Sequence, residues 1–250
     1  MKRIIKNKKG IVIFDGDDLR HADLYKAYCL YTNFEGANLY GVNFKDADCS
    51  EADFNGANCW SANFEGANCW NANFKEAICV SANFQEADCS YADFYKAHCV
   101  DANFYKACCW RTNFQEANCK DANFKEVLCA SANFEKADLR GVNFNKTNLL
   151  YTNLKNAYCY DANFEKADLR GVNFHKTNLL YANLKDIITD TPILQINGSQ
   201  DQVIKWKNQI QIGCIIEEKE WWLENYNETM KEHNYTLEQI KEYYEYITGY

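Results

Sequence analysis

A register of five residues runs through most of the sequence and restricts what the chain can fold into. Every fifth position from Leu19 to Leu184 holds Phe, Cys or Leu, with 14 Phe, 11 Cys and 9 Leu and no insertion. The residue two places before each is Ala, Val or Thr, apart from Asp17, and the residue between them is mostly Asn or Asp. Successive fifth residues rotate by about 140° on a helix and alternate between faces on a straight strand, so neither element buries them all. The pattern therefore predicts a backbone that bends once in every five residues.

The tandem units have the form A(D/N)(L/F)xx and continue over about residues 15–186. In each unit the Ala and the central Phe, Cys or Leu share one side of an extended segment, so both point inward. This pattern resembles the pentapeptide repeat family. The resemblance implies an all-β fold, a right-handed, quadrilateral β-helix with one repeat per side, about twenty residues per coil and about eight coils.

The limits of the register predict three segments. We expect a basic N-terminal segment or cap over residues 1–14 and the β-helix over residues 15–186. Residues 187–250 are expected to form a small α+β cap or interaction module that contains a hairpin and two helices. The hairpin is predicted from the strand-like residues on both sides of NGSQD.

The two C-terminal helices are expected from residue 217 and from residue 236, with Thr236 as the cap of the second. A solenoid must cover its last coil, because an uncovered coil is an open edge. We therefore expect Trp221, Trp222 and Leu223, which begin the first helix, to pack on the end of the rod.

A four-sided coil would stack residues twenty apart in ladders and would place residues ten apart on opposite sides. Two opposite sides then carry Phe ladders, which include Phe34, Phe54 and Phe74 on one side and Phe44, Phe64 and Phe84 on the other. The other two sides carry Cys ladders, which include Cys49, Cys69, Cys89 and Cys109 on one side and Cys59, Cys79 and Cys99 on the other. Large residues on one pair of sides and small ones on the other would fill a narrow interior evenly.

The cysteines in the register are interpreted as small buried hydrophobic residues. Parallel stacking keeps the Cβ atoms of ladder neighbours too far apart for a disulfide. The sequence contains no CxxC pair with which a zinc site could begin. Only Cys108, which lies between inward positions, and Cys214, which lies outside the repeats, are expected to be exposed and reactive.

The outward residues differ between the sides. On one Cys side, Tyr40, Trp60, Val80 and Val100 would form a stripe with Ile78 beside it. Trp70 and Trp110 would lie on the opposite side, two coils apart across Ser90. A contiguous apolar patch usually marks an interface, although a solenoid wall also tolerates flat β-forming side chains. We therefore treat these seven apolar residues as a candidate interaction surface.

Charge and targeting signals limit the compartment and the ligands. The formal net charge is −8, and no broad basic surface exists for nucleic-acid phosphates, so direct nucleic-acid binding is not expected. The apolar run IVIF at residues 11–14 is too short for a signal peptide or a membrane span. Because the cysteines follow a lattice and not the spacing of disulfide staples, we expect a reducing cytoplasm.

No catalytic signature is present in the sequence, so we expect a protein that is not an enzyme and binds no cofactor or metal. His21, His98, His175 and His233 show no metal-ligand spacing, and no phosphate loop or nucleophile motif occurs. The first hypothesis is a non-catalytic structural scaffold that binds a protein partner, or a second copy of itself, through the apolar stripes or the C-terminal helices.

The second hypothesis comes from the resemblance, because some pentapeptide repeat proteins mimic duplex DNA and inhibit or protect DNA gyrase. The unbroken register leaves no projecting loops of the kind that some such members insert. A continuous acidic strip along one side would favour this topoisomerase modulator, and mixed charge would favour the scaffold.

Overall fold

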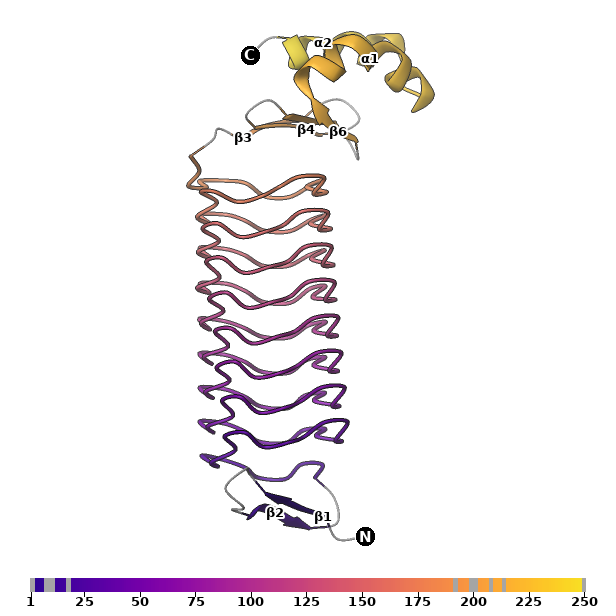
Figure 1. Ribbon diagram of the computed structural model, residues 1–250. Coiled ribbons are helices and arrows are strands. Elements are labelled where there is room, and N and C mark those ends of the chain that lie inside the picture. The colour runs from indigo at the N-terminus through magenta and orange to yellow at the C-terminus, as the bar shows by residue number, and fades with distance from the viewer. Residues whose placement is uncertain are drawn as a thin grey trace.

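The computed structural model describes residues 3–6, 12–16, 19–190, 193–197, 202–206, 209–212 and 215–248. Figure 1 shows a long rod of stacked coils with a hairpin near one end and a sheet followed by helices near the other. The hairpin pairs β1 (Arg3–Lys6) with β2 (Val12–Gly16) in antiparallel orientation. After the coils come β3 (Ile193–Asn197), β4 (Gln202–Trp206), β5 (Gln209–Ile212), β6 (Ile215–Glu218), α1 (Lys219–Glu232) and α2 (Leu237–Thr248).

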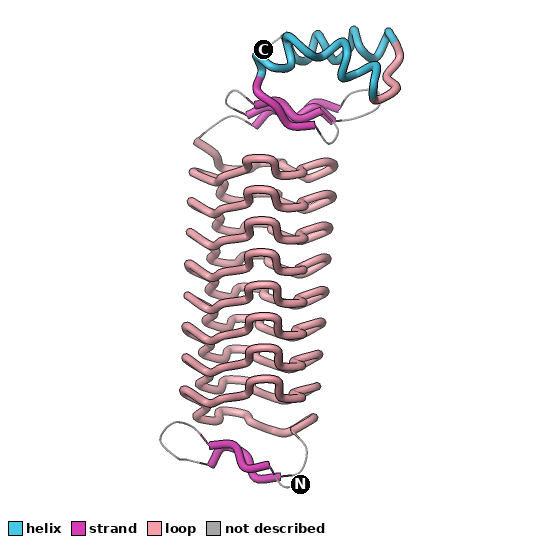
Figure 2. Tube along the Cα trace, turned by 45° about the vertical axis from the view of Figure 1, so that its right-hand side comes forward, coloured by secondary structure: helices cyan, strands magenta, loops and turns pink. Residues whose placement is uncertain are grey.

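The coils repeat every twenty residues. Parallel β-bridges join each residue before a central position to the residue twenty places later, from Asp23–Asn43 to Asp168–Ile188. Twenty residues contain four of the five-residue units, and each unit bends once, as the tube in Figure 2 shows. The repeats therefore form a β-helical solenoid in which each residue stacks on its equivalent in the previous coil.

Each bend is a turn in which the central residue accepts a hydrogen bond from the residue three places later. The second residue after the centre has a positive φ, for example 55° at Glu76 and 57° at Lys106, as a type II turn requires. Gly occupies this position at Gly36, Gly41, Gly56, Gly66, Gly141 and Gly171. At most other turns a non-Gly residue adopts this unfavourable conformation, because the stacked coils hold it there.

All backbone N–H groups of the unit around Phe64 have partners. Asn63 donates to the preceding coil (2.8 Å), and Phe64 (2.6 Å) and Gly66 (2.8 Å) donate to the next coil. Ala67 closes the turn on the carbonyl of Phe64 at 3.0 Å, and Glu65 donates to the side chain of Asn63 at 3.1 Å. The bend therefore leaves no backbone N–H group of this repeat without an acceptor.

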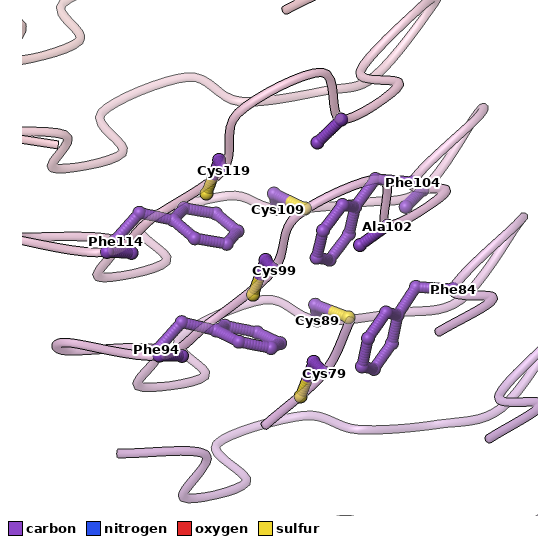
Figure 3. Packing of buried hydrophobic residues seen from close by; sticks show 14 of the residues in the cluster. Cys79, Phe84, Cys89, Phe94, Cys99, Ala102, Phe104, Cys109, Phe114 and Cys119 are labelled. Atoms are coloured by element: carbon purple, nitrogen blue, oxygen red, sulfur yellow. The ribbon is translucent and has the colours of Figure 1, made fainter. Parts of the chain in front are cut away.

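The interior is filled by Phe rings and Cys side chains. Within a ladder the rings stack nearly parallel, with centroids 4.8 Å apart and planes 3° apart for Phe84 and Phe104. Rings of the two opposite ladders meet edge to face, at 5.7 Å and 82° for Phe94 and Phe104. Figure 3 shows the smaller Cys side chains beside these rings. The Phe and Cys residues named above from Phe34 to Cys109 all lie in this buried core.

The C-terminal part contains more strands than the hairpin expected from the sequence. Strands β3 and β4 flank NGSQD, and β5 and β6 extend the described sheet to four strands in the order β3-β4-β5-β6. Residues Glu217 and Glu218, expected at the start of a helix, end β6 because they pair with β5. Thr236 directly precedes α2 and caps it as expected, because its hydroxyl accepts the N–H of Gln239 at 3.3 Å.

The expectation that Trp221, Trp222 and Leu223 pack on the end of the rod is wrong. The sheet lies between the coils and the helices in Figure 1. Trp222 is buried in a separate cluster between the sheet and α2, and its indole N–H donates to the carbonyl of Ile210 at 2.8 Å. Ile204 of β4 joins the apolar core of the solenoid instead.

Candidate interaction surfaces

The four sides of the coil carry different outward residues, and we name each side by one central residue. The Phe44 side and the Phe54 side contain the two Phe ladders, and the Cys49 side and the Cys59 side contain the two Cys ladders. Each repeat presents three residues outward, namely the one before the centre and the two that follow it.

The Phe44 and Phe54 sides carry paired charges of both signs. Ion pairs join lysines to acidic residues of a neighbouring coil, as between Lys45 and Glu65 at 2.9 Å on the Phe44 side. The hydrogen bond that Lys45 donates to the Glu65 carboxylate raises the pKa of Lys45. On the Phe54 side, Lys155 lies 3.3 Å from Glu135. Exposed pairs of this kind contribute little stability, so these two sides are solvated walls of mixed charge.

The Cys59 side carries the apolar stripe expected from the sequence. Tyr40, Trp60 and Ile78 are exposed, Trp60 to 47%, and Val80 and Val100 are half-buried in the two coils that follow. Because equivalent positions stack at every twentieth residue, the structure brings these five residues together on one side. Their spacing along the rod is about 4.8 Å per coil.

The stripe also differs from most repeats in the residue before the centre. In most repeats that residue is Asn or Asp, whose side chain accepts the N–H two places later, as Asn58 does for Trp60 at 3.2 Å. The side chain of Ile78 contains no oxygen that could accept the corresponding N–H of Val80. The repeat therefore gives up a local hydrogen bond in favour of an exposed apolar side chain.

The Cys49 side carries an aromatic cluster in which Tyr91 joins the two expected tryptophans. The ring of Tyr91 lies 6.1 Å from that of Trp70 and 5.0 Å from that of Trp110, both edge to face. The guanidinium of Arg111 lies 4.8 Å from the Trp110 ring and 6.0 Å from the Tyr91 ring. The tryptophans therefore belong to one continuous cluster over three coils.

Tyr91 and Arg111 are candidate residues that reasoning from the sequence missed. The apolar residues expected on the two Cys sides directly follow or directly precede a centre, whereas these two occupy the second position of their turns. A comparison of that second position would have found Tyr31, Tyr91 and Tyr151 on the Cys49 side, sixty residues apart. Side chains from both turn positions contribute to the same wall.

The ladder thiols are buried and unsuited to surface chemistry. Burial raises the pKa of Cys49 and Cys109 well above the ordinary value of a thiol. Cys108 is half-buried at the surface of the Cys49 side, where its sulfur lies 3.0 Å from the hydroxyl of Ser90. Cys214 lies outside the described residues.

Two further features complete the described surface. A cavity of about 380 Å³ lies where the Phe54 and Cys59 sides meet, and its walls include Lys136, Arg140 and Tyr158. Arg140 is already held by two hydrogen bonds to Asp138, at 2.8 and 2.5 Å. Over the part of the chain that the structure describes, no cluster of His, Cys, Asp and Glu could hold a metal ion, and no helix is long and apolar enough to cross a membrane.

Comparison with known proteins identifies the repeats. The family model described as pentapeptide repeats matches in 8 copies, over residues 18–48, 43–78, 82–118, 122–158 and 152–188. No curated protein matches the chain.

Three similar solved structures are pentapeptide repeat proteins or a resistance protein. HetL from the cyanobacterium Nostoc sp. strain PCC 7120, involved in heterocyst differentiation regulation, is 23% identical over 68% of this chain and 82% of its own, with a TM-score of 0.37. A pentapeptide repeat protein of the Arabidopsis thaliana thylakoid lumen is 23% identical over 39% of this chain and 68% of its own, with a TM-score of 0.33. A trypsin-treated form of QnrB1, a plasmid-mediated fluoroquinolone resistance protein, is 19% identical over 69% of this chain and 89% of its own, with a TM-score of 0.36.

Proposed function

The chain belongs to the pentapeptide repeat family, and we propose that it is a non-catalytic scaffold that binds a protein partner through one side of its rod. The observation that carries this proposal is the separation of outward residues by side. Apolar and aromatic residues gather on the two Cys sides, whereas paired charges cover the two Phe sides. A wall that served only stability would have no reason to segregate them in this way.

We further infer the finer architecture that the family implies. The β-helix is right-handed and four-sided, spans residues 15–186 and has about eight coils. Residues 1–14 and 187–250 cap its two ends, a role supported at the second end by the burial of Ile204 in the solenoid core. We also infer a reducing cytoplasm, because the ladder cysteines are free thiols.

The Cys59 stripe is the side that we assign to the partner. Trp and Tyr are the residues that contribute most to binding when a partner buries them, and Trp60 lies at the centre of the stripe. Tyr40 and Ile78 are exposed beside it. A partner with a flat apolar patch would bury these side chains and displace the water that now covers them.

A matched pair of variants tests this assignment. We expect Trp60→Glu to abolish capture of a cytoplasmic partner by the full-length immobilised chain, because a charge would be buried in the interface. Tyr25→Glu is the control, since Tyr25 is an equally exposed aromatic residue at the same repeat position on the Phe44 side. Quantitative mass spectrometry of the bound proteins measures the difference, and identical profiles for both variants and the wild type would overturn the assignment.

The gyrase modulator is the alternative function. Mimicry of DNA requires a continuous acidic strip along the rod. On the Phe sides, ion pairs place lysines beside the acidic residues instead, as Lys155 lies beside Glu135. We therefore rank it second. A supercoiling assay with purified gyrase tests it directly: we expect no effect at a large molar excess of the chain, and inhibition or protection from a quinolone would reverse the ranking.

A further inference from the structure

We propose that the Cys49 side binds the Cys49 side of a second copy of this chain, with the two rods antiparallel and related by a two-fold axis. This inference rests on the proposed interaction role and deepens it by naming one partner and the side of the rod that it occupies. Its basis is the order of side chains along the Cys49 side and the charges that this order brings together.

Large and small residues alternate from coil to coil along the Cys49 side. Trp70 and Trp110 are each 41% exposed, whereas Ser50 and Ser90, each in the coil before one of these tryptophans, are only 8% and 6% exposed. The Cys59 side has no such alternation, because its large residues follow one another in successive coils. The residues directly after the centres of the Cys49 side are Leu30, Ser50, Trp70, Ser90, Trp110, Ala130 and Leu150.

An antiparallel pair of rods matches this alternation. A two-fold axis that crosses the rod at right angles reverses the order of the coils and keeps each repeat position opposite its equivalent. We place the axis midway between the coils of Trp70 and Ser90. Each large residue of one copy then faces a small residue of the other: Trp70 faces the partner's Ser90, Trp110 faces the partner's Ser50 and Leu30 faces the partner's Ala130.

Registers with the axis displaced by half a coil to either side are unfavourable. With the axis on the coil of Ser90, Trp70 would face the partner's Trp110, and Asp88 would face the partner's Asp88. With the axis on the coil of Trp70, that ring would face its own equivalent, and Asp48 would face the partner's Asp88. Both registers set large side chains against each other and bring like charges together, which costs binding free energy.

The favoured register also brings opposite charges together. Arg111 of each copy faces the partner's Glu51, so the two-fold axis creates this pair twice. The guanidinium of Arg111 is already held near the rings of Trp110 and Tyr91, so less side-chain entropy is lost when it binds a carboxylate. Leu128, which is 54% exposed, faces the partner's Tyr28. No residue in this register faces a residue of like charge.

The size of the contact predicts a weak, reversible dimer. Six coils overlap, which at about 4.8 Å per coil and about 16 Å across one side gives on the order of 450 Å² per copy. An interface of this size lies below the standard size for stable complexes and is typical of transient ones. We therefore expect dissociation in the micromolar range, and the opposite Cys59 side remains open to another partner.

Charge reversal on the full-length chain tests the register by sedimentation equilibrium over about 1–200 μM, a range that spans the expected transient affinity. We expect the wild type to form dimers and both Arg111→Glu and Glu51→Arg to raise the dissociation constant at least about tenfold. The double variant restores the opposite pair with its signs exchanged, so we expect it to dimerise within about threefold of the wild type.

The control for this test is Lys106→Glu, because Lys106 occupies the same turn position on the Phe44 side and also lies over an aromatic ring, 5.0 Å from that of Tyr105. We expect it to dimerise like the wild type. A wild type that stays monomeric at 200 μM, about the top of the range for a transient complex, overturns the proposal. So do single reversals that leave the dimer intact, or a double variant that fails to recover.

The outcome is distinguishable from that of the proposed function. A monomeric chain that still loses its partner through Trp60→Glu overturns only the dimer on the Cys49 side. A dimer that forms normally in Trp60→Glu, combined with an unchanged set of captured proteins, overturns only the assignment of the Cys59 stripe.

Discussion

At the scale of the residue, the Asn or Asp before each centre makes the five-residue unit possible. Its side-chain oxygen accepts the N–H two places later, which satisfies a donor that the bend would otherwise leave without an acceptor. On the Phe44 side the same Asn side chains also form a ladder, in which Asn103 donates to Asn83 at 3.0 Å and accepts from Asn123 at 3.0 Å. One residue type therefore stabilises both the turn and the stacking of coils.

Substitution at Asn103 separates these two roles. We expect Asn103→Ala to lower the free energy of unfolding by about 2 kcal/mol, because it removes the bond to Tyr105 N–H and both ladder bonds. Asn103→Asp keeps the turn acceptor and loses the donor to Asn83, so we expect about half that loss. Denaturant titration followed by circular dichroism measures both, with His98→Ala, at the same repeat position on the Cys59 side, as a control expected to change stability by less than about 0.5 kcal/mol. Equal losses at both positions would contradict this account.

The buried thiols predict how stability depends on pH. Burial raises the pKa of Cys159, so the folded state keeps its proton where the unfolded state, with a pKa of about 8.5, releases it. The stabilisation is complete below the unfolded pKa and is lost as pH rises toward the folded pKa, by about 1.4 kcal/mol per pH unit for each such thiol.

We expect Cys159→Ala to be less stable than the wild type at pH 7 and to lose stability less steeply between pH 8.5 and pH 10.5, a range above the unfolded pKa of about 8.5. Denaturant midpoints at fixed pH values measure both slopes. Lysines and tyrosines also titrate in this range, and they contribute equally to both proteins, so the difference isolates the thiol. Parallel curves would contradict this prediction, because they would show that Cys159 releases its proton equally in the folded and the unfolded state.

At the scale of the element, the Phe ladders act as one packed column and not as separate side chains. Each inner ring, such as Phe104, stacks on two rings of its own ladder and meets two rings of the opposite ladder edge to face. Such contacts add to the free energy of burial because the ring edge is positive and the ring face negative. The column explains why Phe and not Leu fills most of these positions.

We expect Phe104→Ala to cost about 3–5 kcal/mol, because neighbouring rings cannot close the cavity without leaving their own stacks. Phe104→Leu is expected to cost less than about 2 kcal/mol, since Leu154 already occupies an equivalent inward position. Thermal or denaturant unfolding of the two variants measures this difference. A Leu variant as unstable as the Ala variant would show that aromatic stacking outweighs the volume of the side chain.

At the scale of the whole molecule, strand β4 connects two separate cores. Ile204 belongs to the apolar core of the solenoid, whereas its neighbour Val203 belongs to the cluster that holds Trp222 and Tyr243. Adjacent strand residues point to opposite faces, so a single strand contributes to the core of the rod and to the cluster that holds the helices. At this end of the rod, the apolar core thus includes a residue of the sheet and not the tryptophans of α1.

This arrangement predicts different results for two neighbouring substitutions. We expect Ile204→Asp to uncover the last coil and to cause association between rod ends, because an open β edge pairs with other edges. Val203→Asp is expected to release α1 and α2 to proteolysis while the rod stays unassociated. Sedimentation velocity and limited trypsin digestion distinguish the two, and the same behaviour for both variants would contradict a sheet that separates two cores.

The solenoid follows from local sequence, because the same information is repeated in every five-residue unit. The small residue and the central Phe, Cys or Leu, together with the Asn or Asp between them, define the bend and the inward side wherever they occur. The resemblance to the pentapeptide repeat family implied stacked coils, and the family model confirms that resemblance. The residues of the apolar stripe around Trp60 could be identified from their spacing of twenty. The ends were less predictable, because β6 carries glutamates that are equally typical of the first turn of a helix.

Contacts between outward side chains, in contrast, depend on the tertiary structure. Tyr91 reaches Trp70 and Trp110 because residues about twenty apart in sequence stack in neighbouring coils, and the direction of each side chain depends on its neighbours there. The placement of Trp222 also depended on the sheet that intervenes between the rod and the helices. Backbone periodicity follows from residues close in sequence, whereas a surface is built from side chains of different coils, and only their packing in space specifies it.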